Sequence, residues 1–372
     1  MIPEPFDRER IRLRPLSERR SKLGIEEIAL AGAGPAPPAG DVGPVLDELA
    51  REIEKARARG APVVICHGAH LIKNGLGPVL ARLVNDGWLT HVATNGAGSI
   101  HDWEFAHHGR STEDVRAYVA VGEFGLWDET GKYIGLALLA GGLEGLGYGE
   151  AIGRLIVEDR IEIPKPEILD ALARAALDGK MPADRGAAAL DLLDAVRRGA
   201  PAGEVRVAHP WKRFSIQAIC REKQVPFTVH PGVGQDIIYG HPLLSGAALG
   251  RASMTDFLIF ASTIERLEGG VYLSVGSSVM SPMIFEKSLS MARNVLRQEG
   301  RRVDDFTLVV NDLAEVDWDW SRGEPPPENP AYYVRFCKSF SRMGGRFRYV
   351  GLDNRVFLHH LYASLRRGGS GP

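Results

Sequence analysis

Short apolar runs alternate with helical segments along most of this chain, and this alternation constrains the fold more than any other feature. Residues 62–66 and 89–94 read as strands buried on both faces. Residues 77–86, between them, have the apolar spacing of a helix. Strand, helix and strand within about thirty residues is the size of a parallel, right-handed crossover unit. Five more strands are predicted, at 205–208, 226–229, 270–275, 306–310 and 348–350.

The alternation continues to residue 367, which predicts one doubly wound α/β domain over 41–367 with a mostly parallel sheet. Residues 1–40 are charged and rich in Pro and Gly, so we expect an arm with a linker at 32–40. The arm is basic between Arg12 and Lys22, and we interpret it mainly as a solvated segment that wraps a neighbour or its own domain. Residues 144–200 are predicted to form a helical insertion at the sheet edge, and 368–372 a disordered tail.

Composition excludes several classes of protein. The chain has 45 basic and 47 acidic residues, a net charge of -2, which argues against a nucleic-acid binder. Its 3 cysteines are an odd number and lie far apart, so we expect no disulfide framework and a reducing cytoplasm. No run approaches about 18 apolar residues, so no membrane span is predicted.

The residues that follow the predicted strands are those that a ligand site needs. Ligands of open α/β sheets bind beyond the carboxyl ends of the strands. Gly, Ser, Asn, His or Asp follows five of these strands, at 67–70, 95–102, 230–236, 276–278 and 311–312. Glycines there let the backbone approach a ligand, and helix N-termini can hold phosphate. The sequence therefore predicts a ligand crevice at this edge.

The loops do not carry the standard dinucleotide fingerprint, because no Gly-x-Gly-x-x-Gly follows the first strand. Five segments instead resemble deoxyhypusine synthase. They are His70-Leu71-Ile72-Lys73-Asn74-Gly75, the loop from Thr94 to Asp102, Gly122-Glu123-Phe124, Gly232-Val233-Gly234-Gln235-Asp236-Ile237-Ile238 and Tyr349-Val350-Gly351-Leu352-Asp353. The resemblance covers roughly residues 45 to 365.

That resemblance implies a Rossmann-like NAD-binding fold, a homotetramer and NAD in an interface crevice. It also implies oxidation of a polyamine with NAD, followed by transfer of an aminobutyl group through a lysine imine. Together with the strand-end loops it gives ten candidate cofactor-binding residues. They are His70, Thr94, Asn95, Gly96, Ala97, Gly98, Asp236, Gly276, Ser277 and Asp312.

The chain departs from the family at the imine lysine. The family's Trp-Gly-Lys falls on residues 316–323, and no lysine occurs between Lys287 and Lys338. Arg322 cannot replace it, because a guanidinium stays protonated and is no amine nucleophile. Lys73 is an alternative imine lysine, although a solvated helix-start lysine is the simpler interpretation. Hypusine formation through the usual lysine is therefore not expected.

Histidines near the predicted strand ends are candidates for proton transfer, since an imidazole titrates near neutral pH. We expect His101 or His241 to act as base, with Asp102 and Asp236 orienting the cofactor or binding a cation. His101, Glu104 and His108 share a helical face and could alternatively hold a metal, but no metal is predicted.

These observations predict an NAD-dependent enzyme that acts on a C–N or C–OH carbon of a small amine or polyamine-type metabolite. Two alternatives stay open. One is a ligand-binding or regulatory homologue that has lost catalysis together with the lysine. The other is NAD-independent hydrolase or lyase chemistry that uses the histidines.

Overall fold

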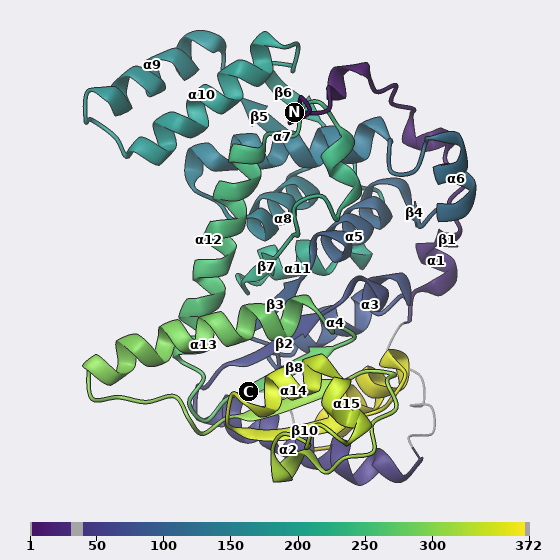
Figure 1. The fold of residues 1–372 in the computed structure, drawn as a ribbon. Coiled ribbons are helices and arrows are strands. Elements are labelled where there is room, and N and C mark those ends of the chain that lie inside the picture. The colour runs from purple at the N-terminus through teal and green to yellow at the C-terminus, as the bar shows by residue number, and fades with distance from the viewer. Residues whose placement is uncertain (1, 31–39, 369–372) are drawn as a thin grey trace.

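A six-stranded parallel sheet forms the centre of the molecule (Figure 1). The computed structural model describes residues 2–30 and 40–368. In spatial order the strands are β10 (Arg346–Val350), β9 (Thr307–Asn311), β8 (Val271–Val275), β2 (Val63–His67), β3 (His91–Thr94) and β7 (Phe227–Val229). Every neighbouring pair is parallel. The predicted doubly wound α/β fold is confirmed.

The strand order reverses between β2 and β8. The chain runs outward from β2 to β3 and β7, returns to place β8 on the other side of β2, and continues to β9 and β10. This is the strand order of dinucleotide-binding sheets, in which ligands bind at the carboxyl edge near the reversal.

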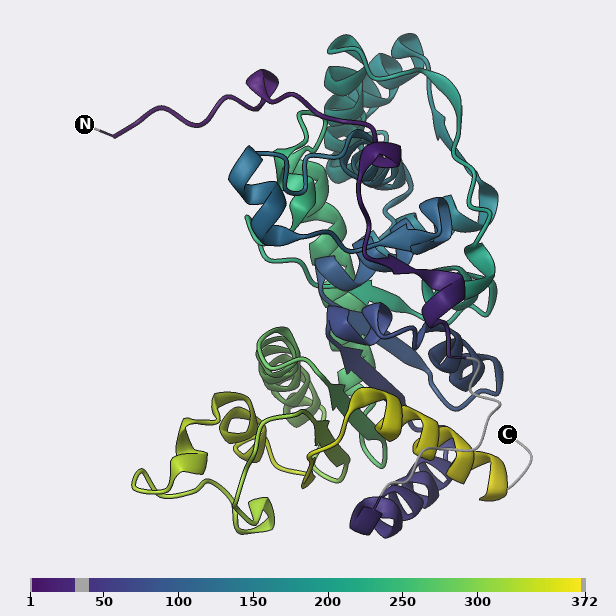
Figure 2. The ribbon, with the colours of Figure 1, turned by 90° about the vertical axis from the view of Figure 1, so that its right-hand side faces the viewer.

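Fifteen α-helices are described, and several of them cover the two faces of the sheet (Figures 1 and 2). They are α1 (Ile25–Ile28), α2 (Gly43–Ala58), α3 (Ala69–Lys73), α4 (Gly77–Asn85), α5 (Gly96–His108), α6 (Val115–Val121), α7 (Asp128–Glu144), α8 (Tyr148–Glu158), α9 (Pro166–Leu177), α10 (Ala183–Arg197), α11 (Ile216–Glu222), α12 (Gly246–Glu265), α13 (Met280–Gln298), α14 (Arg335–Ser341) and α15 (Asn354–Gly368). Of these, α7, α9 and α10 lie away from the sheet, at the top of Figure 1.

The sheet separates two apolar cores, because successive side chains of a strand point to opposite faces. Val63 and Ile65 of β2 lie in the larger core with α2, α4 and α15. Val64 and Cys66 lie in the second core with α13, α14 and the second half of α12. A strand with both faces covered must be apolar throughout, which is why the strands were visible in the sequence.

The predicted strand at 205–208 is wrong as a member of the central sheet. β6 (Gly203–Arg206) pairs antiparallel with β5 (Arg160–Ile163) in a separate two-stranded sheet. Its exposure alternates along the strand, so it has one solvent face and not two buried ones. The expected helical stretch at 144–200 contains α8, β5, α9 and α10.

The N-terminal segment lies along the domain surface, while its first residues project away from it (Figure 2). β1 (Leu23–Gly24) pairs antiparallel with β4 (Arg110–Ser111). Most of the predicted linker at 32–40, and the predicted tail after Gly368, lie outside the described residues. Within the described ranges, no helix is both long enough and apolar enough to cross a bilayer.

Candidate functional site

The carboxyl edge of the sheet brings several predicted residues together. Thr94 ends β3, Gly276 and Ser277 follow β8, and Asp312 follows β9. The buried Thr94 hydroxyl donates to the His67 carbonyl at 2.9 Å, which ties the ends of β2 and β3 to each other. Asp312 accepts from the N–H groups of Leu313 and Ala314 and so shapes its own loop.

The loops on the two sides of the strand reversal are in direct contact. The N–H of Gly68 donates to the Val275 carbonyl at 3.1 Å, and a Cβ on Gly68 would lie 2.0 Å from the Gly276 oxygen. Gly276 itself has φ +59, a conformation that glycine adopts without strain. The glycines at this point therefore let two loops of the chain approach each other.

The first turn of α5 does not present its amides to a phosphate, contrary to the reason we gave for its glycines. Asn95 caps the helix and accepts from the Gly98 N–H at 2.9 Å. A Cβ on Gly96 would lie 2.2 Å from Oδ2 of Asp236, and a Cβ on Gly98 would lie 2.1 Å from Oγ1 of Thr94. The space at Gly96 is thus filled by a carboxylate of the chain itself.

Asp236 is the most unusual carboxylate at this edge. Burial raises its pKa to about 6, against the opposing effect of a hydrogen bond from the Ala97 N–H. Its Oδ2 is buried and has no hydrogen-bond partner among the described residues, and the same holds for the hydroxyls of Tyr148 and Tyr239. Burial and then the charge of Asp236 raise the pKa of Tyr239 to about 12. Asp236 thus offers an unpaired acceptor beside the start of α5.

Asp102 has a structural role, because it joins α5 to the start of α11. It accepts from Oγ of Ser215 at 2.6 Å, from Nε2 of Gln217 at 3.0 Å and from the backbone N–H groups of Ile216 and Gln217. These donors begin α11, where a carboxylate is stabilised by the helix dipole. Burial nevertheless raises the pKa of Asp102. With four donors from α11 and the turn before it, Asp102 holds two helices together rather than facing the crevice.

His241 has partners on both ring nitrogens. Nδ1 accepts from the Leu243 N–H at 3.1 Å, so Nε2 carries the proton and faces Oδ1 of Asp128 at 3.3 Å. A ring held in this way has no nitrogen left to accept a proton from a ligand. Of the two bases that the sequence left open, the geometry favours His101.

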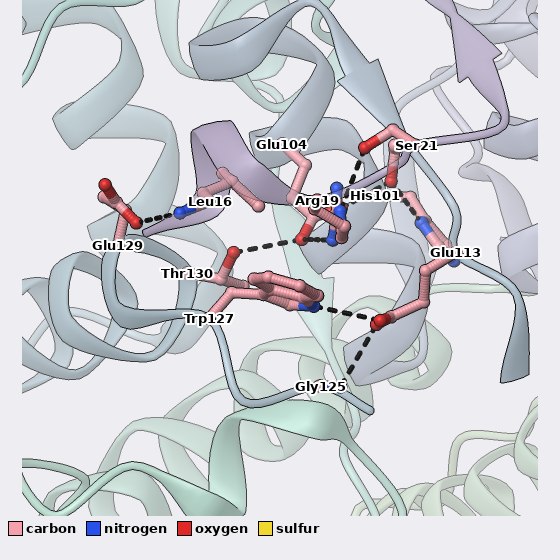
Figure 3. Close-up of polar contacts among 11 residues, drawn as sticks. Leu16, Arg19, Ser21, His101, Glu104, Glu113, Gly125, Trp127, Glu129 and Thr130 are labelled. Carbon is pink, nitrogen blue, oxygen red and sulfur yellow. Dashed lines mark hydrogen bonds and ion pairs between the residues drawn. The ribbon is translucent and has the colours of Figure 1, made fainter. Parts of the chain in front are cut away.

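His101 has one free ring nitrogen, and hydrogen bonding fixes which one it is (Figure 3). Its Nδ1 lies 2.7 Å from Oγ of Ser111, and the Ser111 hydroxyl donates to Oε2 of Glu104 at 2.5 Å. Because that hydroxyl proton is used, Ser111 accepts from Nδ1–H of His101, and Nε2 carries the lone pair. Burial lowers the pKa of His101 to about 4, so the ring is neutral at pH 7.

The surroundings of His101 belong to the first two strand–helix units. α5 packs on α3, and the charges of Lys73 and His70 on α3 lower the pKa of His101, although less than burial does. His70 is exposed and Lys73 is half-buried, with a pKa that burial lowers. Glu104 pairs with Arg19, so it is not available as a metal ligand with His101 and His108.

Two tryptophans in or beside the loops of the domain are core residues. Trp127 is buried and its Nε1 donates to Glu113 at 3.0 Å. Trp320 is buried against Phe347, with ring centroids 5.6 Å apart. Trp318 is half-buried and lines a cavity of about 690 Å³ beside β10.

The sequence missed the residues that support the site. Ser111 carried no signal, because it lies on β4 whereas His101 and Glu104 lie on α5, and the sequence does not show how these two elements pack. Tyr148 and Tyr239 were not noticed either. Glu104 was noticed only for its spacing from His101. A second cavity, of about 250 Å³, lies beside the free edge of β7 and not over the strand ends.

Comparison with known proteins yields similar structures but no family. No protein-family model and no curated protein matches the chain. Unliganded AgrE is 16% identical with a TM-score of 0.44, over 90% of this chain and 34% of that one. AgrE in a ternary complex with ornithine and NAD+ gives 16% and 0.43 over the same shares. A LOR/SDH protein from Methanococcus maripaludis S2 is 14% identical with a TM-score of 0.42, over 89% of this chain and 73% of that one. The chain spans about a third of the length of AgrE.

Proposed function

We propose that this chain is an NAD-dependent enzyme that oxidises a C–N or C–OH carbon of a small amine-bearing metabolite. The observation that carries the proposal is the bare Nε2 of His101 on α5, the helix that follows β3 in a sheet with dinucleotide-binding strand order. NAD, when bound, supplies the hydride acceptor. The chain's own residues must then bind the ligands and take the proton that leaves the substrate nitrogen or oxygen.

His101 suits the second task. Its ring is neutral at pH 7, and its Nε2 has no hydrogen-bond partner in the described part of the chain. As the substrate N–H or O–H loses its proton, Nε2 takes it, and the ring becomes an imidazolium. Glu104 stabilises that cation through Ser111.

Asp236 suits the first task. Asp236 itself follows β7, the third strand of the dinucleotide-binding half of the sheet, but its unpaired Oδ2 reaches Gly96, just after the second strand, β3. In dinucleotide-binding sheets a carboxylate placed at the end of the second strand accepts from ribose hydroxyls. We therefore assign Asp236 to cofactor hydroxyls. The first turn of α5 does not fit the pyrophosphate, since Asp236 and Asn95 occupy it.

Binding and turnover test these two roles separately. Asp236→Asn replaces a charged acceptor, and we expect NAD affinity measured by calorimetry to fall roughly tenfold or more. His101→Gln should retain NAD affinity but lower kcat for amine or polyamine oxidation, followed by NADH absorbance, by about 10²-fold or more.

Asp170→Asn, in an exposed ion pair with Arg174, is the matched control and should change neither quantity. Absence of NAD binding by the wild-type chain would refute the proposal. Binding of NAD without any turnover of amines would instead support the ligand-binding alternative.

A further inference from the structure

Arg19, in the N-terminal segment, forms an ion pair in the interior of the domain. Its Nη1 and Nη2 lie 2.7 and 2.8 Å from the two carboxylate oxygens of Glu104, and both side chains are only 1% exposed. Nε of Arg19 donates to Oγ of Ser21 at 2.9 Å. Figure 3 shows the guanidinium facing this carboxylate, beside the ring of Trp127. The guanidinium that pairs with Glu104 thus comes from outside the α/β domain proper.

The state of Glu104 depends on this partner. Burial on its own would raise the pKa of Glu104, but the charge and hydrogen bonds of Arg19, with smaller effects of His101 and Ser111, together lower the pKa below its ordinary value. An ionised carboxylate only accepts hydrogen bonds. Glu104 therefore accepts hydrogen bonds from the hydroxyl of Ser111 at 2.5 Å and from the hydroxyl of Thr130 at 3.0 Å.

The orientation of Ser111 then decides the tautomer of His101. Because the Ser111 hydroxyl donates its hydrogen bond to Glu104, its oxygen accepts a hydrogen bond from Nδ1–H of His101. The other ring nitrogen, Nε2, is then unprotonated. A protonated Glu104 could instead donate to Ser111. The Ser111 hydroxyl would then be free to donate to Nδ1, and the proton of His101 would move to Nε2. A charge carried by the N-terminal segment thus selects which nitrogen can accept a proton.

Backbone contacts hold the N-terminal segment 14–24 where Arg19 reaches Glu104. Leu23 is the strand partner of Ser111 itself, and the Lys22 N–H donates to the Thr112 carbonyl at 2.7 Å. Arg14 forms a backbone bridge with Trp127. Residues 14–24 therefore deliver Arg19 to Glu104 and fix the strand on which Ser111 lies.

We propose that Arg19 is a positioning residue, and that the segment 14–24 belongs to the site because it fixes His101 as the Nδ1–H tautomer. The catalytic consequence rests on the proposed function, whereas the tautomer does not. Two-bond proton–nitrogen correlation NMR reports the tautomer directly, and His101→Gln assigns the signal among the 11 histidines. In the wild-type chain we expect Nδ1 protonated and Nε2 bare at pH 7.

Substitutions of Arg19 test whether its charge selects the tautomer of His101. Arg19→Gln removes the charge, and we expect the proton of His101 to move partly or wholly to Nε2. Arg19→Lys keeps the charge and should retain the wild-type tautomer. Arg174→Gln, which breaks an exposed ion pair with Asp170 on α9, outside the segment, is the matched control and should change nothing at His101.

Several results would overturn the proposal. One is an Nε2–H tautomer in the wild-type chain, and another is an unchanged Nδ1–H tautomer in folded Arg19→Gln. If Arg19→Gln does not fold, Ser111→Ala gives the decision, because a retained pure Nδ1–H state there would show that Ser111 does not select it. If the tautomer moves as expected while the wild-type chain oxidises no amine, the proposed function fails and the role of Arg19 stands.

Discussion

At the scale of the residue, Asp256 is a carboxylate with no access to water. It lies on α12, is 1% exposed, and its Oδ2 accepts from the N–H groups of Gly149 and Val229 at 2.9 and 2.7 Å. Burial raises its pKa to about 8. It joins α8 and β7 to α12, so its protonation state affects the stability of the whole domain.

Replacement of Asp256 should therefore change how stability depends on pH. A folded-state pKa raised from 3.8 to about 8 means that the folded chain binds the extra proton throughout this window. The contribution to stability is complete below pH 4 and is lost as pH rises to about 8, at up to about 1.4 kcal/mol per pH unit. Urea unfolding of Asp256→Asn should lack this loss. A wild-type free energy of unfolding that rises between pH 5 and pH 8, relative to the variant, would contradict the assignment.

Single residues also show where sequence reasoning ended. The sequence identified Gly96 and His101 as site residues, because glycine and histidine after a strand are chemically distinctive. It gave the wrong reason for Gly96, since the carboxylate that fills its space comes from Asp236, far along the chain. The burial of Arg19 could not be predicted either, because its partner Glu104 is 85 residues away and a basic run ordinarily lies in solvent.

At the scale of the element, strands were predicted well and several helices were not. Strands buried on both faces are continuous apolar runs, which are easy to see. α7 was missed because nearly every residue from Ile134 to Gly142 is buried, and a helix covered on all sides has no amphipathic period. β6 was misplaced because a short run shows that a strand exists and not which sheet it joins.

The packing of α8 against β7 can be tested with glycine. A Cβ on Gly149 would lie 1.8 Å from the Phe227 carbonyl oxygen, so Gly149→Ala must separate helix and strand and should cost about 2 kcal/mol or more. Gly250 lies inside α12 with nothing within 4 Å of its Cβ position, so Gly250→Ala should stabilise by up to about 1 kcal/mol. Thermal unfolding measures both. Equal effects of the two substitutions would show that α8 and β7 are not in close contact.

At the scale of the whole molecule, the homotetramer stays a prediction, and one of its original grounds has changed. Trp318 and Trp320 lie in a polar, Pro-rich loop where bulky rings would need a partner, but Trp320 is buried within its own chain. A new ground is a set of exposed apolar residues on α12 and at the start of α13, two helices in contact: Met254, Leu258, Val279 and Met283 are 57%, 52%, 70% and 53% exposed.

A charge on that surface should dissociate the assembly. Light scattering at micromolar concentration should report a closed oligomer for the wild-type chain and smaller species for Leu258→Glu, because a buried unpaired carboxylate is costly. Leu177→Glu, at the end of α9 where the leucine is 86% exposed, is the control and should leave the oligomer intact. A monomeric wild-type chain would remove the prediction.

The reversal in strand order also sets a sequence of events during synthesis. β2, β3 and β7 leave the ribosome first, while β8, which pairs with the other side of β2, is made 208 residues after β2, as the positions of Val63 and its partner Val271 show. Until then β2, an apolar strand that is buried along its whole length in the finished molecule, has one edge of unpaired N–H and C=O groups. Such an edge is a template for pairing with other chains. The topology that reverses the strand order at the centre of the sheet therefore leaves the nascent chain dependent on protection, by its own helices or by a chaperone, for more than half of its translation.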